Sequence, residues 1–380
     1  MRRIIASLLF FGIFGLHTIS AQNISLPPSG GNQVCEISQY MGLVKVSVNY
    51  SSPDVTANNG DSRKGQIWGK LVPYGLSPNT FGTAKNIPWR AGANKNTIVT
   101  FSHDVLVQGR PIQAGSYGLH MIPVESGAWT VIFSNNNNAW GSYFYDAKDD
   151  ALRVEATPEP CAYQEYLTFD FTVRKQATST LAMKWDELSL PITIEVPNLN
   201  DLYIEEMTAQ LQDIPGYSWQ NLNQAAQFCL SNNTHLDKGM EWANLAVNGA
   251  FVGQANFSTL STKAMLEAKL EKGEELEATL KQAMDHPSAS VLQIHSLGRQ
   301  LIGMGRKTEA LMVFQTNAEK YPETWPVNIG LARGHSAVGN FKEALKFAKK
   351  ARKNVPEGDS LNKNNVEKLI KMLKKEQDIN

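Results

Sequence analysis

Two stretches near the C-terminus determine the fold of the second half of the chain: SLGRQLIGMGRKTEALMVFQTNAEKYP (residues 296–322) and GLARGHSAVGNFKEALKFAKKARKNVP (residues 330–356). The two stretches align with each other when the first is shifted by 34 residues. The shared positions are Gly305 and Gly339, Ala310 and Ala344, and Pro322 and Pro356. A period of this length is typical of helical hairpins that cannot bury their own apolar faces and must stack on their neighbours. The spacing therefore predicts two repeat units, at residues 291–324 and 325–358.

These signature residues resemble the tetratricopeptide (TPR) repeat, in which small residues lie where two helices meet and a proline opens the next unit. Weaker units precede them at residues 260–287 and 221–247, and a capping helix is predicted over residues 363–376. The resemblance implies an α-helical solenoid over residues 201–380. It also implies a concave groove that binds a protein or peptide partner.

The first half of the chain has a period of two instead. Val44, Val46 and Val48 alternate with Lys45 and Ser47, which is the pattern of a half-buried strand. Similar runs are found at residues 97–101, 117–122, 129–134, 152–156, 167–173, 180–185 and 192–196. The pattern predicts an all-β sandwich or barrel over residues 34–197. The long stretch 54–93 is either a functional excursion or a covering loop.

An ordered set of motifs lies within this β region. They are IWGKLVPYG (67–75), PWRAGAN (88–94), AGSYGLHMIP (114–123), WTVIF (129–133), WG (140–141), LRV (152–154) and IEV (194–196). The set resembles the bacterial domain-of-unknown-function family 2911 (DUF2911) over about residues 33–197. The resemblance implies a β-domain that often follows a signal peptide and in some members precedes helical repeats. It implies no substrate.

The N-terminus predicts export. Arg2 and Arg3 precede an apolar run at residues 4–16, and Ile19-Ser20-Ala21 provides the small residues that signal peptidase needs. We expect cleavage after Ala21, which leaves a loose leader at residues 22–33 and a periplasmic or secreted protein. The alternative is a retained N-terminal anchor. No later apolar run is long enough for a transmembrane segment.

Composition argues against several classes of function. The 36 basic and 36 acidic residues balance, so the chain lacks the basic excess of a nucleic-acid binder. GxGxxG, Walker, HExxH and GxSxG motifs are absent, and the seven histidines lack metal-ligand spacing. We therefore expect no cofactor and no metal. Cys35 and Cys161 could form a disulfide, with Cys229 left over, but free thiols are favoured because a domain of this size needs no cross-link.

Six residues of the β region are candidates for ligand binding: Trp68, Trp89, Arg90, Asn94, His120 and Trp140. Arg90 beside an aromatic face could hold a carboxylate or a sugar. The favoured alternative is a brace in which Arg90 pairs with Asp104 or Glu165. His120 could act as a base or ligand, but a satisfied core histidine is favoured. The three tryptophans could stack on a sugar, although loop packing is favoured.

The leading functional hypothesis is an exported, non-catalytic binding or scaffold protein of the cell envelope. Its helical groove would bind a partner, and its β-domain would hold an unknown ligand. A second hypothesis is a hydrolase or transferase that acts on an envelope glycan or small molecule through Arg90 and His120. A third makes the β-domain purely structural. Convergence of Trp68, Trp89, Arg90 and His120 on one pocket would favour the first two over the third.

Overall fold

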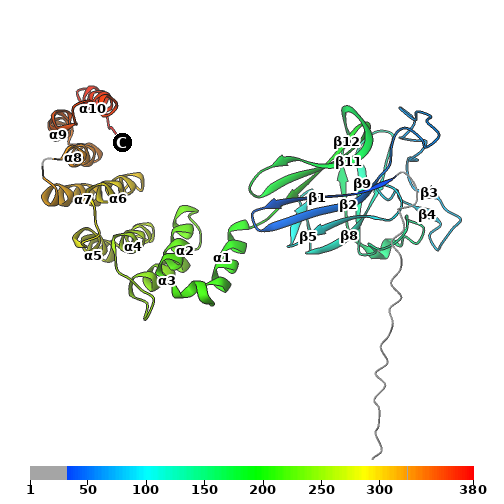
Figure 1. Cartoon of the computed structure of the whole chain (residues 1–380), viewed down its shortest axis with the longest axis horizontal. Coiled ribbons are helices and arrows are strands. Elements are labelled where there is room, and N and C mark those ends of the chain that lie inside the picture. The colour runs from blue at the N-terminus through cyan, green and yellow to red at the C-terminus, as the bar shows by residue number, and fades with distance from the viewer. Residues whose placement is uncertain (1–31, 323) are drawn as a thin grey trace, which may run out of the picture. The chain divides into compact units, whose positions relative to one another are not determined.

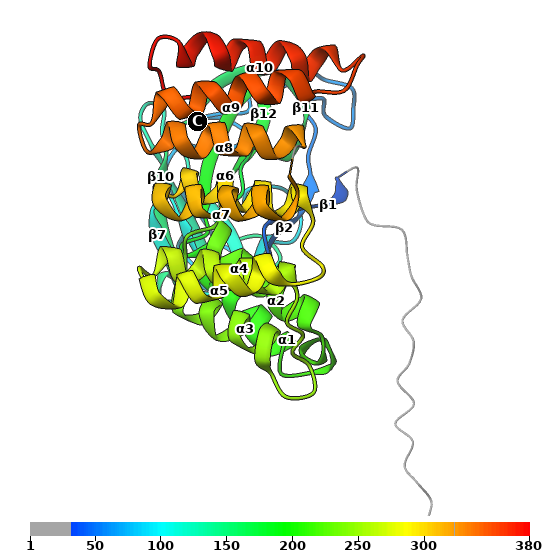
Figure 2. The same ribbon diagram turned by 90° about the vertical axis from the view of Figure 1, so that its left-hand side faces the viewer.

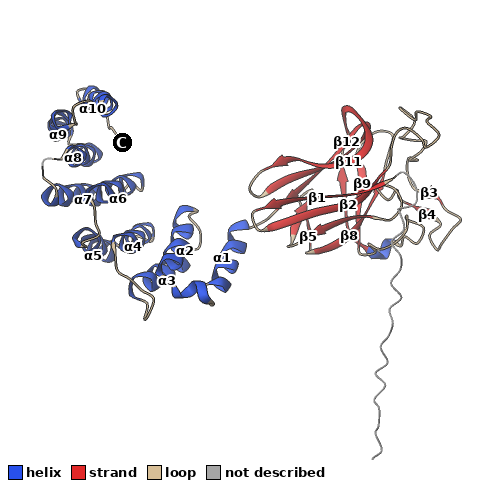
Figure 3. Cartoon of the chain, in the orientation of Figure 1, coloured by secondary structure: helices blue, strands red, loops and turns tan. Residues whose placement is uncertain are grey.

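The structure, a computed structural model, describes residues 32–322 and 324–380 and divides between Pro197 and Asn198 into two compact units (Figure 1). Strands make up the first unit and helices the second (Figure 3). The predicted signal peptide and nearly all of the leader lie outside the described residues. Each unit has its own core.

Two antiparallel sheets form the N-terminal unit. In the described part of the chain, the larger sheet has the strand order β1-β2-β5-β8-β9-β10 and the smaller has the order β11-β12-β6-β7, while β3 and β4 pair separately. The bounds are β1 Gln33–Met41, β2 Val44–Ser52, β3 Ser77–Pro78, β4 Asn86–Ile87, β5 Thr97–Phe101, β6 Val105–Val107, β7 Arg110–Ile112, β8 Gly115–Ile122, β9 Trp129–Ser134, β10 Asp150–Ala156, β11 Glu159–Arg174 and β12 Thr178–Glu195.

The two sheets pack face to face as a sandwich. Tyr50 of β2 meets Phe169 of β11 edge to face at a ring distance of 5.0 Å, and the Ser52 hydroxyl donates a hydrogen bond to the carbonyl of Leu167. Val46 and Val48 are fully buried while Lys45 and Ser47 are not, as the period of two requires. The all-β prediction is therefore confirmed, in its sandwich form.

Two of the predicted strands are one. The runs predicted at residues 180–185 and 192–196 fall on the single long strand β12, which ends at Glu195. This strand pairs with β11 between Ser179 and Ser189 and with β6 at Ile194 and Glu195. The stretch 54–93 is a long loop segment whose named strands are those of the short β3–β4 hairpin. The amide of Val55 donates a hydrogen bond to the carbonyl of Glu165 in β11. This segment lies over the sandwich as a covering loop.

Helices form the C-terminal unit throughout its described residues. Their bounds are α1 Leu199–Gln210, α2 Trp219–Ser231, α3 Leu236–Asn248, α4 Phe257–Lys269, α5 Gly273–Asp285, α6 Val291–Gly303, α7 Lys307–Lys320, α8 Trp325–Ala337, α9 Phe341–Asn354 and α10 Ser360–Leu373. They stack in chain order (Figure 2). We call the side of the stack formed by α2, α4, α6 and α8 the inner face; Figure 1 shows α4, α6 and α8 on this side.

The repeat signature has a structural basis at each predicted position. Gly305 and Gly339 both adopt φ +79°, a left-handed conformation that ends α6 and α8 at equivalent points and that favours glycine. Ala310 and Ala344 have no exposed surface, and lie where α7 and α9 approach their partner helices. The predicted TPR-like solenoid is confirmed.

The capping helix is displaced from its predicted bounds. It runs over Ser360–Leu373 instead of residues 363–376 because the Asp359 carboxylate accepts a hydrogen bond from the Asn362 amide and so begins the helix earlier. Val366 and Leu373 are buried against α8 and α9. Leu369 is only partly buried.

Candidate binding sites

Four tryptophans meet between the two sheets. Trp68, from the covering loop, contacts Trp89, Trp129 and Trp185 at ring distances of 5.6, 4.9 and 5.8 Å. Trp89 stacks on Trp185 at 6.2 Å with only 15° between the ring planes. Trp129 and Trp185 are core residues, each 1% exposed. Trp68 therefore packs the covering loop onto the core. This agrees with the favoured hypothesis that the loop tryptophans serve loop packing.

A cavity of about 290 Å³ lies beside this cluster. The covering loop supplies Asp54, Asn58 and Arg63, while Trp89 and Arg90 come from the PWRAGAN motif and Trp185 from β12. We call it the arginine cavity. It brings together two of the six predicted ligand residues, Trp89 and Arg90. Arg63 and Asp54 were not predicted, because nothing in the local sequence of the covering loop marks them.

The two arginines are held differently. Arg63 donates from Nε to the carbonyl of Val55 at 3.0 Å and from Nη2 to the carbonyl of Asp54 at 2.7 Å. Neither bond uses Nη1. Arg90, by contrast, has a buried Nε without an acceptor among the described residues. A Cβ built on Gly141 would come within 2.7 Å of its Nη1, so the absence of a side chain at Gly141 leaves room for this guanidinium.

The predicted brace between Arg90 and an internal acid is wrong. Asp104 accepts a hydrogen bond from the amide of Ala114 at 2.8 Å. Glu165 accepts from the amide of Thr56 at 2.8 Å and from the Tyr163 hydroxyl. In the described residues neither acid forms an ion pair with Arg90. Both acids are instead used to hold turns and the covering loop in place.

Asn94 and Trp140 lie outside the lining of the arginine cavity. Asn94 adopts φ +58°, and its carbonyl accepts a hydrogen bond from the amide of Gly141 at 2.9 Å. Lys95 forms a bridge with Trp140, whose side chain is 52% exposed. Asn94 thus has a backbone role in joining two loops, and Trp140 packs on neither the tryptophan cluster nor the cavity.

His120 is a satisfied core histidine. It lies on β8 and is 3% exposed, with Nδ1 2.9 Å from the Ser142 hydroxyl and its ring 5.4 Å from that of Tyr145. Burial lowers the pKa of His120 to about 4. The neighbouring residue Met121 pairs through its backbone with Trp89, and strand alternation turns the His120 side chain to the face opposite to that of Met121. His120 is not among the described residues that line the arginine cavity.

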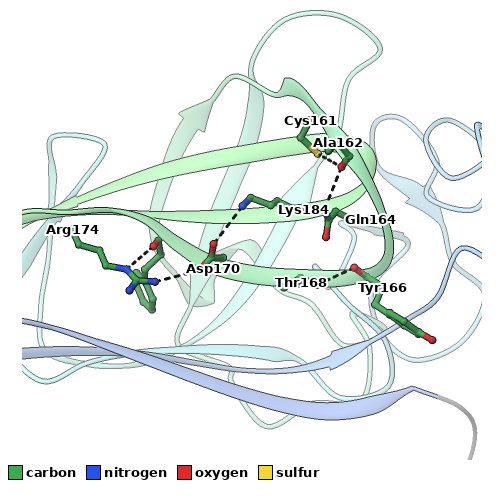
Figure 4. A network of polar contacts seen from close by, with 9 residues as sticks. Cys161, Ala162, Gln164, Tyr166, Thr168, Asp170, Arg174 and Lys184 are labelled. Atoms are coloured by element: carbon green, nitrogen blue, oxygen red, sulfur yellow. Dashed lines mark hydrogen bonds and ion pairs between the residues drawn. The ribbon is translucent and has the colours of Figure 1, made fainter.

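The cysteines are all free. Cys161, on β11, lies beside a polar network in which Lys184 Nζ is 3.4 Å and Arg174 Nη2 is 3.7 Å from the carboxylate of Asp170 (Figure 4). Its Sγ is 3.3 Å from the carbonyl of Ala162. These ion pairs are partly exposed and hold the β11–β12 hairpin at its surface. Cys35 is half-buried on β1, and Cys229 is fully buried in α2.

The helical unit carries a second candidate site, a groove of about 520 Å³ on the inner face. Side chains of α2, α4 and α6 line it, with Met304 just after α6; they include Gln227, Thr262, Met265, Gln300 and Met304. Gln227 Nε2 donates to the Thr262 hydroxyl at 3.1 Å, so helices two apart in sequence are joined across the inner face. Amides and thioethers together suit an extended peptide, because the amides can pair with its backbone and methionine adapts to its side chains.

Further along the inner face, residues 378–380 of the chain itself dock on α8. Arg333 Nη1 donates to the carbonyl of Ile379 at 2.8 Å, and Asn380 Nδ2 donates to the carbonyl of Arg333 at 3.2 Å. The Ser336 hydroxyl donates to Asp378 at 2.8 Å and accepts from the amide of Ile379 at 3.1 Å. Ile379 is 5% exposed, within the cluster formed by α8, α9 and α10. Figure 1 shows this end of the chain beside α8.

Basic groups surround this docked segment. Burial and the nearby charge of Arg299 lower the pKa of Arg333, while Asp378 raises it. Arg299 and Arg333 are 34 residues apart, so they occupy equivalent positions of α6 and α8. His295, one turn before Arg299 on α6, has its pKa lowered to about 4 by burial and by both arginines. Asp378 thus interacts with Arg333, which lies close to Arg299 of the preceding repeat.

Among residues 32–322 and 324–380, no group of His, Cys, Asp and Glu side chains could hold a metal ion. Within the same residues, no helix is both long and apolar enough to cross a membrane.

The motifs, the sandwich and the covering loop agree with a family match to the β-unit. Residues 33–194 match the family described as "Protein of unknown function (DUF2911)". The predicted resemblance is confirmed, and we call this part the DUF2911 region. Among curated proteins, none matches the chain.

Solved structures similar to the chain are helical-repeat proteins. A structure of MamA MSR-1 has 18% identity and a TM-score of 0.27, over 40% of this chain and 92% of the MamA chain. Another MamA structure has 14% identity and a TM-score of 0.30, over 40% and 85%. YrrB, described as a TPR protein with an unusual peptide-binding site, has 16% identity and a TM-score of 0.29, over 45% and 89%. At these scores, the repeat architecture rests on the helices and the 34-residue spacing of this chain.

Proposed function

We propose that the chain is an exported, non-catalytic scaffold protein of the cell envelope whose inner face binds a peptide segment of a partner protein. The docking of residues 378–380 on α8 is the observation that carries this proposal. It supplies an extended segment, an apolar side chain in a buried socket and hydrogen bonds to its backbone. These are the elements of peptide recognition on a preformed helical surface.

The groove of α2, α4 and α6 supports the same function. A peptide that extends from α8 along the inner face would meet the amides of Gln227 and Gln300 and the basic side chain of Arg299. The proposed partner segment therefore combines an acidic residue with an apolar one, as Asp378 and Ile379 do. Export rests on the sequence of residues 1–21, and N-terminal sequencing of the exported protein should begin at Gln22.

The enzymatic alternative has less support. It needs Arg90 and His120 in one pocket, whereas Arg90 lines the arginine cavity and His120, which is hydrogen-bonded to Ser142, is not among the described lining residues. Burial also lowers the pKa of His120 to about 4, well below the value near 7 that suits a general base at neutral pH.

Fluorescence anisotropy with a labelled peptide KKEQDIN, the sequence of residues 374–380, tests the proposal. We expect it to bind a variant that lacks residues 377–380 and to bind the intact chain much more weakly, because the intact chain occupies α8 itself. Arg333→Ala in the shortened variant should weaken binding by about tenfold, since a charged hydrogen bond to the peptide carbonyl is lost.

Arg352→Ala is the matched control, because Arg352 pairs with Glu367 on α10 and contributes nothing to the docked segment. A peptide with Ile379 replaced by Asp should fail to bind, since it would place a charge in the apolar socket. Equal binding of the peptide to the Arg333→Ala and Arg352→Ala variants would contradict the proposal.

A further inference from the structure

The arginine cavity of the DUF2911 region has the chemistry of a small-molecule site, separate from the peptide-binding inner face. Arg63, Arg90 and Asp54 are the charged residues of its described lining, which therefore carries a net positive charge. In the described residues none of these groups forms an ion pair with another. Its volume of about 290 Å³ is close to the lower end of the roughly 300–1,000 Å³ typical of small-molecule sites.

Buried donors without acceptors point to what the cavity takes. Arg90 Nε and Trp185 Nε1 are both buried, and neither has an acceptor among the described residues. Both residues line the cavity. Buried polar groups in folded proteins are nearly always paired, since an unpaired buried donor has lost its hydrogen bonds to water without replacing them. A ligand that enters the cavity can supply these acceptors through carboxylate oxygens.

The guanidinium groups are prepared for such a ligand. Two backbone carbonyls fix Arg63 while Nη1 takes part in neither bond, so this arginine is oriented before any ligand arrives. Gly141 leaves the space in which Arg90 Nη1 lies. Preorganised arginine forks bind carboxylates through two parallel bonds, which a lysine cannot reproduce.

The remaining walls add a second requirement. Trp89, which is half-buried, offers aromatic surface, and Asp54 and Asn58 add residues with hydrogen-bonding side chains. Asp54 would repel a simple anion but can accept hydrogen bonds from hydroxyl groups. Aromatic faces pack against the C–H face of a sugar ring by apolar contact.

We propose that the arginine cavity binds a small hydroxylated carboxylate of the sugar-acid class. The carboxylate pairs with Arg63 and Arg90, the hydroxyl groups donate to Asp54, and the ring lies against Trp89. This site uses no residue of the inner face, so it stands independently of peptide binding.

Isothermal titration of the full chain tests the site with three probes: D-glucuronate, D-glucose and inorganic sulfate. We expect glucuronate to bind, glucose to bind at least about tenfold more weakly, and sulfate to bind at least about tenfold more weakly than glucuronate. The difference between glucuronate and glucose measures what the carboxylate contributes to binding. The difference between glucuronate and sulfate measures what the hydroxylated ring contributes. Equal binding of glucuronate and glucose, equal binding of glucuronate and sulfate, or no binding of glucuronate would each overturn the proposal.

Variants locate the binding. Arg90→Ala and Arg90→Lys should both weaken glucuronate binding by about tenfold or more, because lysine keeps the charge but not the fork. Asp54→Asn should weaken glucuronate binding while leaving sulfate binding unchanged or stronger. Arg174→Ala removes a surface arginine that pairs with Asp170 and serves as the control. Glucuronate binding that is equally strong in the parent and both Arg90 variants would overturn the assignment, and a circular dichroism spectrum confirms that each variant is folded.

Discussion

Arg63 and Arg90 line the same cavity, but only Arg63 is tied to the fold by hydrogen bonds. Its two bonds to Val55 and Asp54 hold the covering loop in its observed path. Arg90 has no comparable partner in the described residues, and its Nε is buried without an acceptor. The two side chains should therefore contribute very differently to the free energy of unfolding.

We predict that Arg63→Ala lowers the stability of the DUF2911 region by about 1.5–3 kcal/mol, since hydrogen bonds from a charged donor to buried carbonyls are lost. Arg90→Ala should change it by less than about 0.5 kcal/mol, as substitutions that break no bond usually do. Urea titrations of the two variants beside the parent measure both effects. A larger loss for Arg90→Ala than for Arg63→Ala would contradict this assignment.

His120 gives the fold a pH dependence. Its pKa is about 4 in the folded chain and about 6.5 when unfolded, so the unfolded chain binds more protons between these values. Stability conferred by neutral His120 is thus complete above about pH 6.5 and is lost as the pH falls toward 4, by up to about 3 kcal/mol. Urea titrations at pH 7.5 and 4.5 should show a smaller decrease in the His120→Gln variant than in the parent.

His103→Gln is the matched control for this prediction. His103 is hydrogen-bonded to Ser102 at the surface, where removal of the imidazole exposes no buried group. As the pH is lowered, the stability of the His103→Gln variant should fall as steeply as that of the parent chain. Parallel pH profiles for His120→Gln and the parent would show that His120 does not carry this dependence.

Sequence reasoning found part of the site and missed part of it for a physical reason. Trp89 and Arg90 are neighbours in one motif, so their joint position could be predicted. Asp54 and Arg63 lie in a stretch with no periodicity, and they reach the cavity only because the covering loop packs on β11. The partner of Arg90 could not be predicted, since contacts of long sequence separation leave no local pattern.

At the scale of elements, the repeats and most of the longer strands could be predicted, whereas β1 and the shortest strands could not. The 34-residue spacing located α6 to α9 because glycine and alanine have fixed roles there. Strand β1 was missed, since most of its residues are exposed or half-buried and show no apolar alternation. Strands β6 and β7 have only three residues each, which is too short for a period to be read.

We predict that Ala310→Trp destabilises the repeats and that Lys349→Ala does not. Ala310 has no exposed surface in α7, so an indole there must push neighbouring side chains and helices apart, at a cost of about 1–3 kcal/mol. Lys349 lies on the exposed side of α9. Thermal unfolding of the full chain, followed by far-ultraviolet circular dichroism at the helix minimum, compares the two. Equal midpoints would refute the register of the repeats.

At the scale of the whole molecule, the change from strands to helices at Pro197 predicts that the first unit folds alone. Its two sheets bury their own apolar faces against each other, and β12 ends at Glu195 before α1 begins at Leu199. A fragment of residues 22–198 should give a circular dichroism spectrum dominated by β-structure and a cooperative thermal transition. A spectrum of random coil, or one dominated by helix, would contradict the boundary.

The segment docked on α8 also sets a threshold for any competitor. Only residues 374–377 separate it from the end of α10, so it is an intramolecular ligand with an effective concentration of about millimolar order, as is usual for short flexible tethers. A partner that needs the same contacts must displace it, and its apparent affinity falls in proportion to the time the segment spends bound. Weak, abundant peptides are thereby screened out. A partner that also engages the groove of α2, α4 and α6 gains the extra contacts needed to win that competition.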